Sequence, residues 1–373
     1  MLISRFTAKI DKKIKTHDVP VLYLPITDAH GILPPNRNQK WTAKDINNII
    51  NNVQAQKISE EAYHCISKLS FSHKNILLIF KLNNLFFGCI VEFKNKGTAK
   101  LHIKLESQIV DIIPVKINRC DFKFLNSQIG NSFSEKHIAI IGVGSLGSYI
   151  ANELVLSGYK NLTIIDEDKI DYENLFRYRS SYLTNSWNKT TLTKYNCEHT
   201  HPEVNVRAFA NSLSSKNYKD YITEEIDVII FAVGNSDVQL KMNKSFIENN
   251  NKIPVFYCWL EVDGETSHVA AIHNTLDGCF ECLYTDNDGT LCANTVNKVK
   301  TAEVSYIRNG CGGTRVPYGN ITLLNATALL LFALNDLWDK NRLYSFQEKQ
   351  IFVSDFPKNE RCNRCAVRKQ TEC

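Results

Sequence analysis

Two Cys-x-x-Cys pairs, Cys279 with Cys282 and Cys362 with Cys365, lie far apart in this chain, and both follow a glycine-rich loop at residues 142–147. Four thiolates in two such pairs are the ligand set of a structural zinc ion, although a single pair also occurs in redox proteins. The glycine loop has the form of a nucleotide-phosphate site. Together the motifs predict a nucleotide-using α/β domain whose C-terminal tail is held back by Zn²⁺.

Composition excludes several classes of protein. The 373 residues are 43% apolar and can bury a large core, while a net charge of +5 without a basic tract argues against nucleic-acid binding. Residues 1–16 are basic but lack the apolar run of a signal peptide. The apolar stretch 321–338 contains Asn and Asp residues, which favours a buried helix over a membrane span. Twelve cysteines without an export signal favour a cytoplasmic protein with metal-binding or catalytic thiols.

Residues 1–118 differ in sequence pattern from the rest of the chain, and this pattern predicts a smaller α+β accessory domain. Thr42 with Asp45 three positions later indicates a helix start over 42–53. Asn83 and Asn84 separate two apolar runs and indicate the turn of a β-hairpin. The strands expected here are 75–81, 85–93, 99–103 and 109–115. This domain shows no recognisable chemistry.

Residues 119–373 alternate between strands and helices. This alternation predicts a Rossmann-like, mainly parallel sheet with helices on both faces, followed by the zinc-clipped region. The expected strands are 137–141, 161–165, 204–210, 228–233, 256–260 and 267–273. One expected helix spans 145–157, and a second one begins with residues 190–197.

Gly142, Gly144 and Gly147 lie between a predicted strand and a predicted helix, and Asp166 ends the next strand. Glycines let the backbone approach phosphates, and the helix N-terminus supplies amide hydrogens and a positive dipole. An acid at the position of Asp166 accepts hydrogen bonds from ribose hydroxyls. This fingerprint alone does not separate NAD from ATP.

Asn174, Arg177 and Lys189 follow Asp166 and favour ATP. A triphosphate that is cleaved needs its charge neutralised and its pyrophosphate leaving group stabilised, whereas hydride transfer does not need these groups. The alternative is that Arg177 and Lys189 are ordinary solvated surface charges.

The runs 137–147, 162–168 and 174–177, with Lys189, resemble the ThiF/MoeB adenylyltransferase family, bacterial relatives of ubiquitin-activating enzymes. The lead-in at 118–125 is similar to the branch tied to ubiquitin-like conjugation in antiviral (phage) defence. The resemblance spans about residues 118–370. It implies ATP, Mg²⁺ and structural Zn²⁺ as cofactors, a homodimer, and nucleotide contacts by Asp166, Asp168, Asn174, Arg177 and Lys189.

The chain departs from the family pattern in the loop after the fourth strand. Gly234 stands where the family usually has a magnesium-binding Asp, while Asn235 is in place and Asp237 follows. Asp168 or Asp237 is therefore expected to substitute as the magnesium ligand. Arg119 is a weak candidate for the arginine that family dimers lend to the partner's site.

Cys311 lies in a glycine-rich loop before the apolar helix. An exposed thiol in such a loop reacts readily as thiolate. In the ubiquitin-activating branch that the chain resembles, such a cysteine takes the acyl group from AMP as a thioester. Cys292 is the second candidate. Four other cysteines are expected to be buried apolar residues: Cys65, Cys89, Cys197 and Cys258. No role is assigned to His199 and His201.

The sequence thus predicts ATP-dependent activation of a ubiquitin-like protein by adenylation, thioester formation on Cys311, and transfer to a conjugating-enzyme-like acceptor. One alternative is an adenylyltransferase without the thioester step, serving sulfur transfer or peptide modification. Another is a non-catalytic subunit that binds a ubiquitin-like protein. An NAD oxidoreductase is weakened by Asn174, Arg177 and Lys189.

Overall fold

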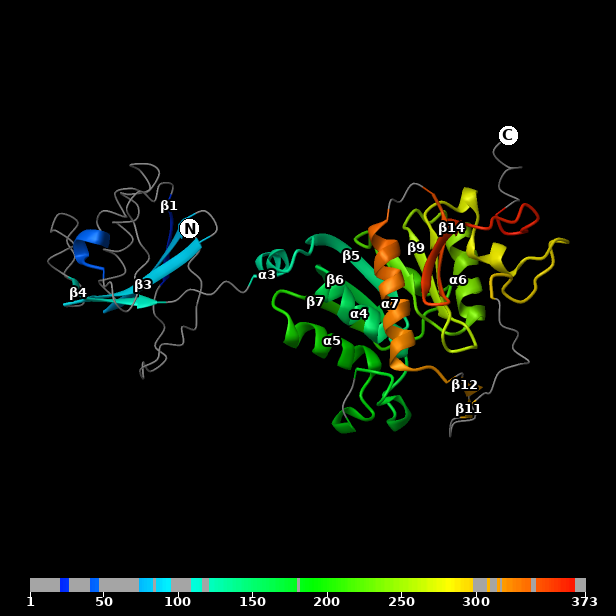
Figure 1. Cartoon of the computed structure of the whole chain (residues 1–373), viewed down its shortest axis with the longest axis horizontal. Helices are drawn as coiled ribbons and strands as arrows, with labels where there is room; N and C mark the ends of the chain where they lie inside the picture. Colours follow the sequence, from blue (N-terminus) through cyan, green and yellow to red (C-terminus); the bar gives the residue numbers. More distant parts are fainter. Residues whose placement is uncertain are drawn as a thin grey trace. The chain divides into compact units, whose positions relative to one another are not determined.

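The computed structural model describes residues 21–26, 41–46, 74–82, 85–94, 109–115, 121–179, 182–297, 307–308, 314–315, 317–336 and 340–365. The chain divides into two compact units, Met1–Arg119 and Cys120–Cys373. Figure 1 shows the elements of both units, coloured along the chain.

The first unit contains a four-stranded sheet in the order β1-β2-β3-β4. Strand β1 pairs with β2 in parallel, and β2, β3 and β4 pair antiparallel. Their bounds are Val21–Ile26, Asn75–Leu82, Leu85–Phe93 and Ile109–Val115.

The predicted hairpin of this unit is confirmed, as is its continuation by β4. The predicted helix start is also present, because the Thr42 hydroxyl donates to Asp45 Oδ2 at 2.7 Å. Residues 47–53 and 99–103, where the helix and a further strand were expected, lie outside the described residues.

The second unit is built on an eight-stranded sheet in the order β14-β13-β10-β9-β8-β5-β6-β7. The five strands from β9 to β7 run parallel, which confirms the mainly parallel sheet, and β10, β13 and β14 add antiparallel. The bounds are β5 Ser134–Ile141, β6 Tyr159–Ile165, β7 Asn205–Phe209, β8 Val228–Phe231, β9 Val255–Leu260, β10 Ser267–Ile272, β13 Arg342–Gln347 and β14 Gln350–Asp355. Central strands such as β8 are buried on both faces, as their unbroken apolar sequence requires.

Helices cover both faces of this sheet (Figure 1). One core joins α4 and α7 to one face and includes Cys197 of α5, while the other core joins α6 and the Cys-x-x-Cys segments to the opposite face. The helix bounds are α4 Ser145–Leu156, α5 Lys189–Thr200, α6 Ser236–Glu248 and α7 Asn320–Asn335, and a short α3 spans Phe122–Gln128.

Helix α7 corrects one prediction. It was expected to be buried over 321–338, but it ends at Asn335 and exposes one side, on which Ile321, Leu324 and Phe332 are 75%, 42% and 47% exposed. The helix forms the outer layer on one face of the sheet, so only its inner side is covered. Among the described helices none is both long and apolar enough to span a bilayer.

The strand order of the sheet reverses at β5. The chain leaves β5 toward β6 on one side and returns to β8 on the other side. In open parallel sheets, ligands bind outside the carboxyl ends of the strands where the strand order reverses in this way. The glycine loop after β5 and the loop after β8 meet at this point.

Candidate nucleotide site and cysteine cluster

The glycine loop 142–147 connects β5 to α4 in a conformation that two of its glycines make possible. Gly142 has φ +83°, which disfavours other residues. A Cβ on Gly147 would lie 1.9 Å from the Gly142 carbonyl oxygen. A Cβ on Gly144 would meet nothing within 4 Å. The structure itself therefore requires Gly142 and Gly147, whereas Gly144 leaves open space at the N-terminus of α4.

This difference predicts opposite effects for two alanine substitutions. Gly147→Ala forces a methyl group into the loop and is expected to lower the free energy of unfolding by about 3 kcal/mol. Gly144→Ala is expected to leave the thermal unfolding temperature unchanged and to weaken ATP binding about tenfold or more, because its methyl group intrudes on the approaching phosphates. Calorimetry of unfolding and of ATP binding measures both; equal effects of the two substitutions on stability would contradict this assignment.

Asp166 joins the glycine loop to the strand beside it. Its carboxylate accepts hydrogen bonds from the backbone N–H groups of Val143 at 2.8 Å and Asp168 at 2.9 Å. Burial raises the pKa of Asp166, and the Lys189 ammonium and the Asp168 N–H group offset this in part. As pH falls, Asp166 is therefore protonated at a higher pH than a solvated aspartate is.

The segment between β6 and α5, together with the first residue of α5, carries the predicted phosphate-binding residues. Lys189, the first residue of α5, places its ammonium 2.7 Å from Asp168 Oδ2 and is only 13% exposed. The hydroxyl of Tyr178 bonds to the Lys189 carbonyl oxygen at 2.9 Å and to Thr193 Oγ1 at 2.7 Å. Together with a small apolar cluster around Tyr178, these contacts fix the segment against α5.

Arg177 and Asn174 lie in the same segment. Asn174 belongs to a short 3₁₀ turn, where its side-chain oxygen accepts from the Asp171 N–H group at 3.4 Å. The Arg177 Nη1 group donates to the hydroxyl of Tyr318 at 3.2 Å. Tyr318 precedes α7, which begins at Asn320. The Tyr149 hydroxyl of α4 donates a hydrogen bond to the Asn320 side chain and so connects the start of α7 to α4. Arg177 is thus tied to the layer that contains the glycine-loop helix.

The loop after β8 adjoins the glycine loop, since a Cβ on Gly147 would lie 3.4 Å from Ala232. Asn235 caps α6 by accepting hydrogen bonds from the N–H groups of Asp237 and Val238 at 2.9 and 3.3 Å. Asp237 lies in the first turn of α6. A Cβ on Gly234 would meet nothing within 4 Å, so the position leaves room for a ligand.

The two Cys-x-x-Cys pairs meet as predicted. The sulfur atoms of Cys279, Cys282, Cys362 and Cys365 all lie within 4.8 Å of one another, and all four residues are buried. The Cys279–Cys362 and Cys282–Cys365 sulfur distances are 3.8 and 3.5 Å. Sulfur ligands in a zinc tetrahedron with bonds of about 2.3 Å are about 3.8 Å apart, so the donor set and its spacing fit Zn²⁺.

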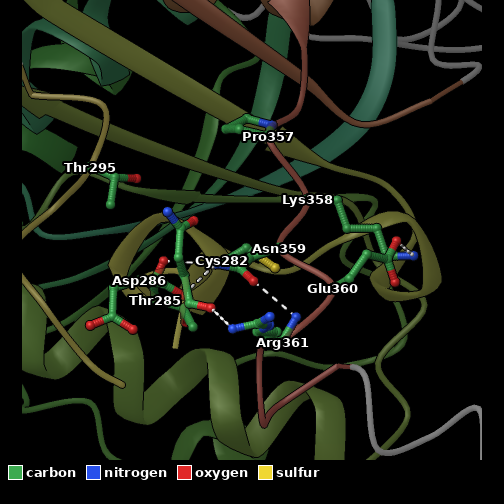
Figure 2. A pocket seen from close by; sticks show the side chains of 10 residues that line it. Cys282, Thr285, Asp286, Thr295, Pro357, Lys358, Asn359, Glu360 and Arg361 are labelled. Atoms are coloured by element: carbon green, nitrogen blue, oxygen red, sulfur yellow. Dashed lines mark hydrogen bonds and ion pairs between the residues drawn. The ribbon is translucent and has the colours of Figure 1, made fainter. Parts of the chain in front are cut away.

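Polar contacts bind the C-terminal segment to the loop after the first pair. Asn359 donates to the carbonyl oxygens of Thr285 and Asp286 at 2.8 and 3.1 Å, and Arg361 donates to that of Asn287. Figure 2 shows this region around an open hollow of about 660 Å³. Its lining is Cys282, Thr285, Asp286, Asn287, Thr295, Pro357, Lys358, Asn359, Glu360 and Arg361. None of the candidate nucleotide-site residues lines it, so the hollow belongs to the region around the four cysteines, residues 279–297 and 356–365, which we call the clip.

The candidate thiols differ in what the structure describes. Cys311 and Arg119 lie outside the described residues. Cys292 is half-buried in the clip, where its sulfur contacts the Ala293 carbonyl oxygen and its N–H group donates to Tyr284. The predicted burial is confirmed for Cys89, Cys197 and Cys258. Cys65 lies outside the described residues. His199 lies in the last turn of α5, as expected of a helix C-terminus, and stacks on Tyr195.

Tyr318 was not predicted as a site residue. Its place in Pro317-Tyr318-Gly319 indicates a turn before a helix but does not reveal a partner. The contact with Arg177 joins residues 141 positions apart, and only the folded chain brings them together.

The ThiF family model matches residues 121–367 of the chain. SUMO-activating enzyme subunit 2 of Dictyostelium discoideum is 26% identical over 148 residues, which cover 39% of this chain and 22% of that protein. The ATP-dependent ubiquitin transferase-like protein Cap2 of Pseudomonas aeruginosa is 21% identical over 225 residues, covering 58% and 39%.

Among solved structures, Escherichia coli MccB with MccA-N7isoASN aligns with a TM-score of 0.47 at 18% identity, covering 62% of this chain and 66% of that chain. The matched part of the chain spans less than half the length of the SUMO-activating enzyme subunit and of Cap2.

Proposed function

The chain belongs to the ThiF family, and from this premise we propose that it activates the C-terminal carboxylate of a ubiquitin-like protein by adenylation. The relatives named as SUMO-activating enzyme subunit 2 and ubiquitin transferase-like protein support a ubiquitin-like substrate. We therefore prefer this function to the alternatives of sulfur transfer and peptide modification.

The linked arrangement of glycine loop, acid and lysine is the observation that carries the proposal. Asp166 bonds to Val143 of the loop, and Lys189 pairs with Asp168, two residues beyond Asp166. A nearly buried ammonium beside a helix N-terminus suits a triphosphate, whose charge needs cations as well as backbone amides. An NAD site has no such requirement.

In the proposed reaction, an oxygen of the substrate carboxylate attacks the α-phosphorus of ATP, and pyrophosphate leaves with the electron pair of the broken P–O bond. Asp166 accepts hydrogen bonds from the ribose hydroxyls and fixes the nucleotide. Lys189 and Arg177 stabilise the charge that develops on the phosphates, and Asn174 orients them.

Carboxylates at two places are suited to hold Mg²⁺, which supplies charge neutralisation at the phosphates. Asp168 is 64% exposed on its side chain, and Asp237 lies in the first turn of α6 near the open position Gly234. We assign the magnesium ligand to these two residues, with Asn235 holding the α6 end of the loop. Zn²⁺ bound by the four clustered cysteines is structural, since four thiolates leave no open position.

Cys311 then attacks the acyl carbonyl in the proposed second step. A C–S bond forms, the bond to the phosphate oxygen breaks, AMP leaves, and the thiol proton passes to solvent. A conjugating-enzyme-like partner takes the acyl group from this thioester. A homodimer and a place in a bacterial ubiquitin-like conjugation system of antiviral defence complete the proposal.

The thioester step is tested by intact-mass spectrometry of the chain without reductant, after incubation with Mg·ATP and a ubiquitin-like protein encoded beside its gene. A thiol-sensitive adduct is expected on the wild-type chain and on Cys292→Ala, and none is expected on Cys311→Ala. An adduct lost in Cys292→Ala instead would move the thioester to Cys292. Adenylated substrate without any enzyme adduct would leave an adenylyltransferase alone.

A further inference from the structure

Tyr318 lies beside Arg177, two residues before α7, and has no role in the proposed reaction itself. We propose that Tyr318 is a positioning residue, which holds the Arg177 guanidinium in the orientation that binds the nucleotide phosphates. This inference rests on the proposed function, because it concerns the same site.

The hydrogen bond between the two residues leaves one edge of the guanidinium for an anion. Tyr318 accepts from Nη1 at 3.2 Å, whereas the two-point edge that matches a phosphate is formed by Nε and Nη2. Nε is buried and has no hydrogen-bond partner among the described residues. A buried donor without an acceptor on a cation is unfavourable, and a phosphate at this edge would satisfy it.

Tyr318 is itself held firmly. It packs against the core that contains α4 and α7. A Cβ on Gly264, in the turn between β9 and β10, would lie 2.5 Å from the Pro317 carbonyl oxygen, so the two backbones are in close contact. Thr322, in the first turn of α7, donates to the Gly264 carbonyl oxygen at 2.5 Å. The phenol is therefore a fixed point against which a long, flexible side chain can be oriented.

The backbone near Arg177 is fixed separately, through the hydrogen bonds of the neighbouring Tyr178 to Lys189 and Thr193. Removing the Tyr318 hydroxyl should consequently free the Arg177 side chain without moving the segment that carries it. The expected consequence is a loss that concerns phosphates and leaves recognition of adenine and ribose intact.

Calorimetric titration with ATP and with adenosine tests this. Tyr318→Phe is expected to weaken ATP binding about tenfold, because a hydrogen bond to a charged group is lost, and to leave adenosine binding unchanged. Combined with Arg177→Ala, it should add nothing to the loss caused by Arg177→Ala alone. Tyr149→Phe is the matched control, because it removes a phenol hydroxyl of α4 that bonds to Asn320, the first residue of α7, and has no contact with Arg177.

Several outcomes would overturn the inference. These are unchanged ATP binding by Tyr318→Phe, equal losses for ATP and adenosine, an equal ATP loss in Tyr149→Phe, or additive losses with Arg177→Ala. If the wild-type chain binds adenosine but gains nothing from the phosphates of ATP, the proposed function fails and this inference fails with it. A wild-type chain that binds ATP tightly, with no effect of Tyr318→Phe, removes the inference alone.

Discussion

Replacing Lys189 by alanine is expected to slow ATP–pyrophosphate exchange at least about a hundredfold, which is the usual effect of losing one preorganised donor to a developing charge. The ammonium is held at the start of α5, is 13% exposed, and lies 2.7 Å from Asp168. A nearly buried cation needs no large reorganisation to meet the phosphates. Burial raises the pKa of Asp166, the acid assigned to the ribose, and the Lys189 ammonium opposes this shift, which indicates that its charge acts on the same site.

Lys194→Ala supplies the matched control for this experiment. Lys194 belongs to the same helix, but its ammonium contacts Glu198 and the Val206 carbonyl oxygen. The control should retain exchange while matching the change in charge. If the folded Lys189→Ala variant exchanged ATP and pyrophosphate at the wild-type rate, the assignment of Lys189 to the phosphates would be contradicted.

The second large effect that we expect is the loss of stability when the four-cysteine zinc site is broken. The purified chain should contain one zinc ion, and Cys362→Ser should lose it, lower the free energy of unfolding by about 4 kcal/mol or more, and lower the unfolding temperature by about 10 °C. The four sulfur atoms connect segments 83 residues apart, so breaking the cluster releases the C-terminal segment from the loop it covers.

Metal analysis, thermal unfolding and limited proteolysis check this prediction. Cleavage near residues 357–365 should become rapid in Cys362→Ser. Cys292→Ser is the control, since Cys292 lies in the clip but outside the cluster, and serine can keep the hydrogen bond to Ala293. Full zinc content and unchanged stability in Cys362→Ser would show that the cluster is not a zinc site.

The half of the sheet around the glycine loop was predictable because its signals are local. An unbroken apolar run, then glycines, then a helix pattern locates β5, the loop and α4, and the acid that follows the next strand is fixed by the strand's end. The cysteine cluster was also predictable, because thiolate spacing within each pair is a property of the sequence. That the two pairs would meet depended on knowing the zinc ligand set.

The antiparallel edge of the sheet was not predicted, for an identifiable physical reason. Strands β13 and β14 are joined by Glu348 and Lys349, which both have positive φ, at +50° and +61°. Such turns normally use Asn or Gly, so neither residue marks a hairpin in the sequence. The contact between Arg177 and Tyr318 and the exposed side of α7 depend on packing between distant segments, and no local pattern encodes them.

Substrate-dependent ATP–pyrophosphate exchange by the wild-type chain is the most direct test of the central claim. The assay supplies Mg·ATP, labelled pyrophosphate and a ubiquitin-like protein encoded beside the gene, with a version of that protein lacking its last residue as control. We predict exchange with the intact C-terminus and none with the shortened protein. Binding of both ATP and the intact protein without any exchange would contradict adenylation and favour a non-catalytic docking subunit.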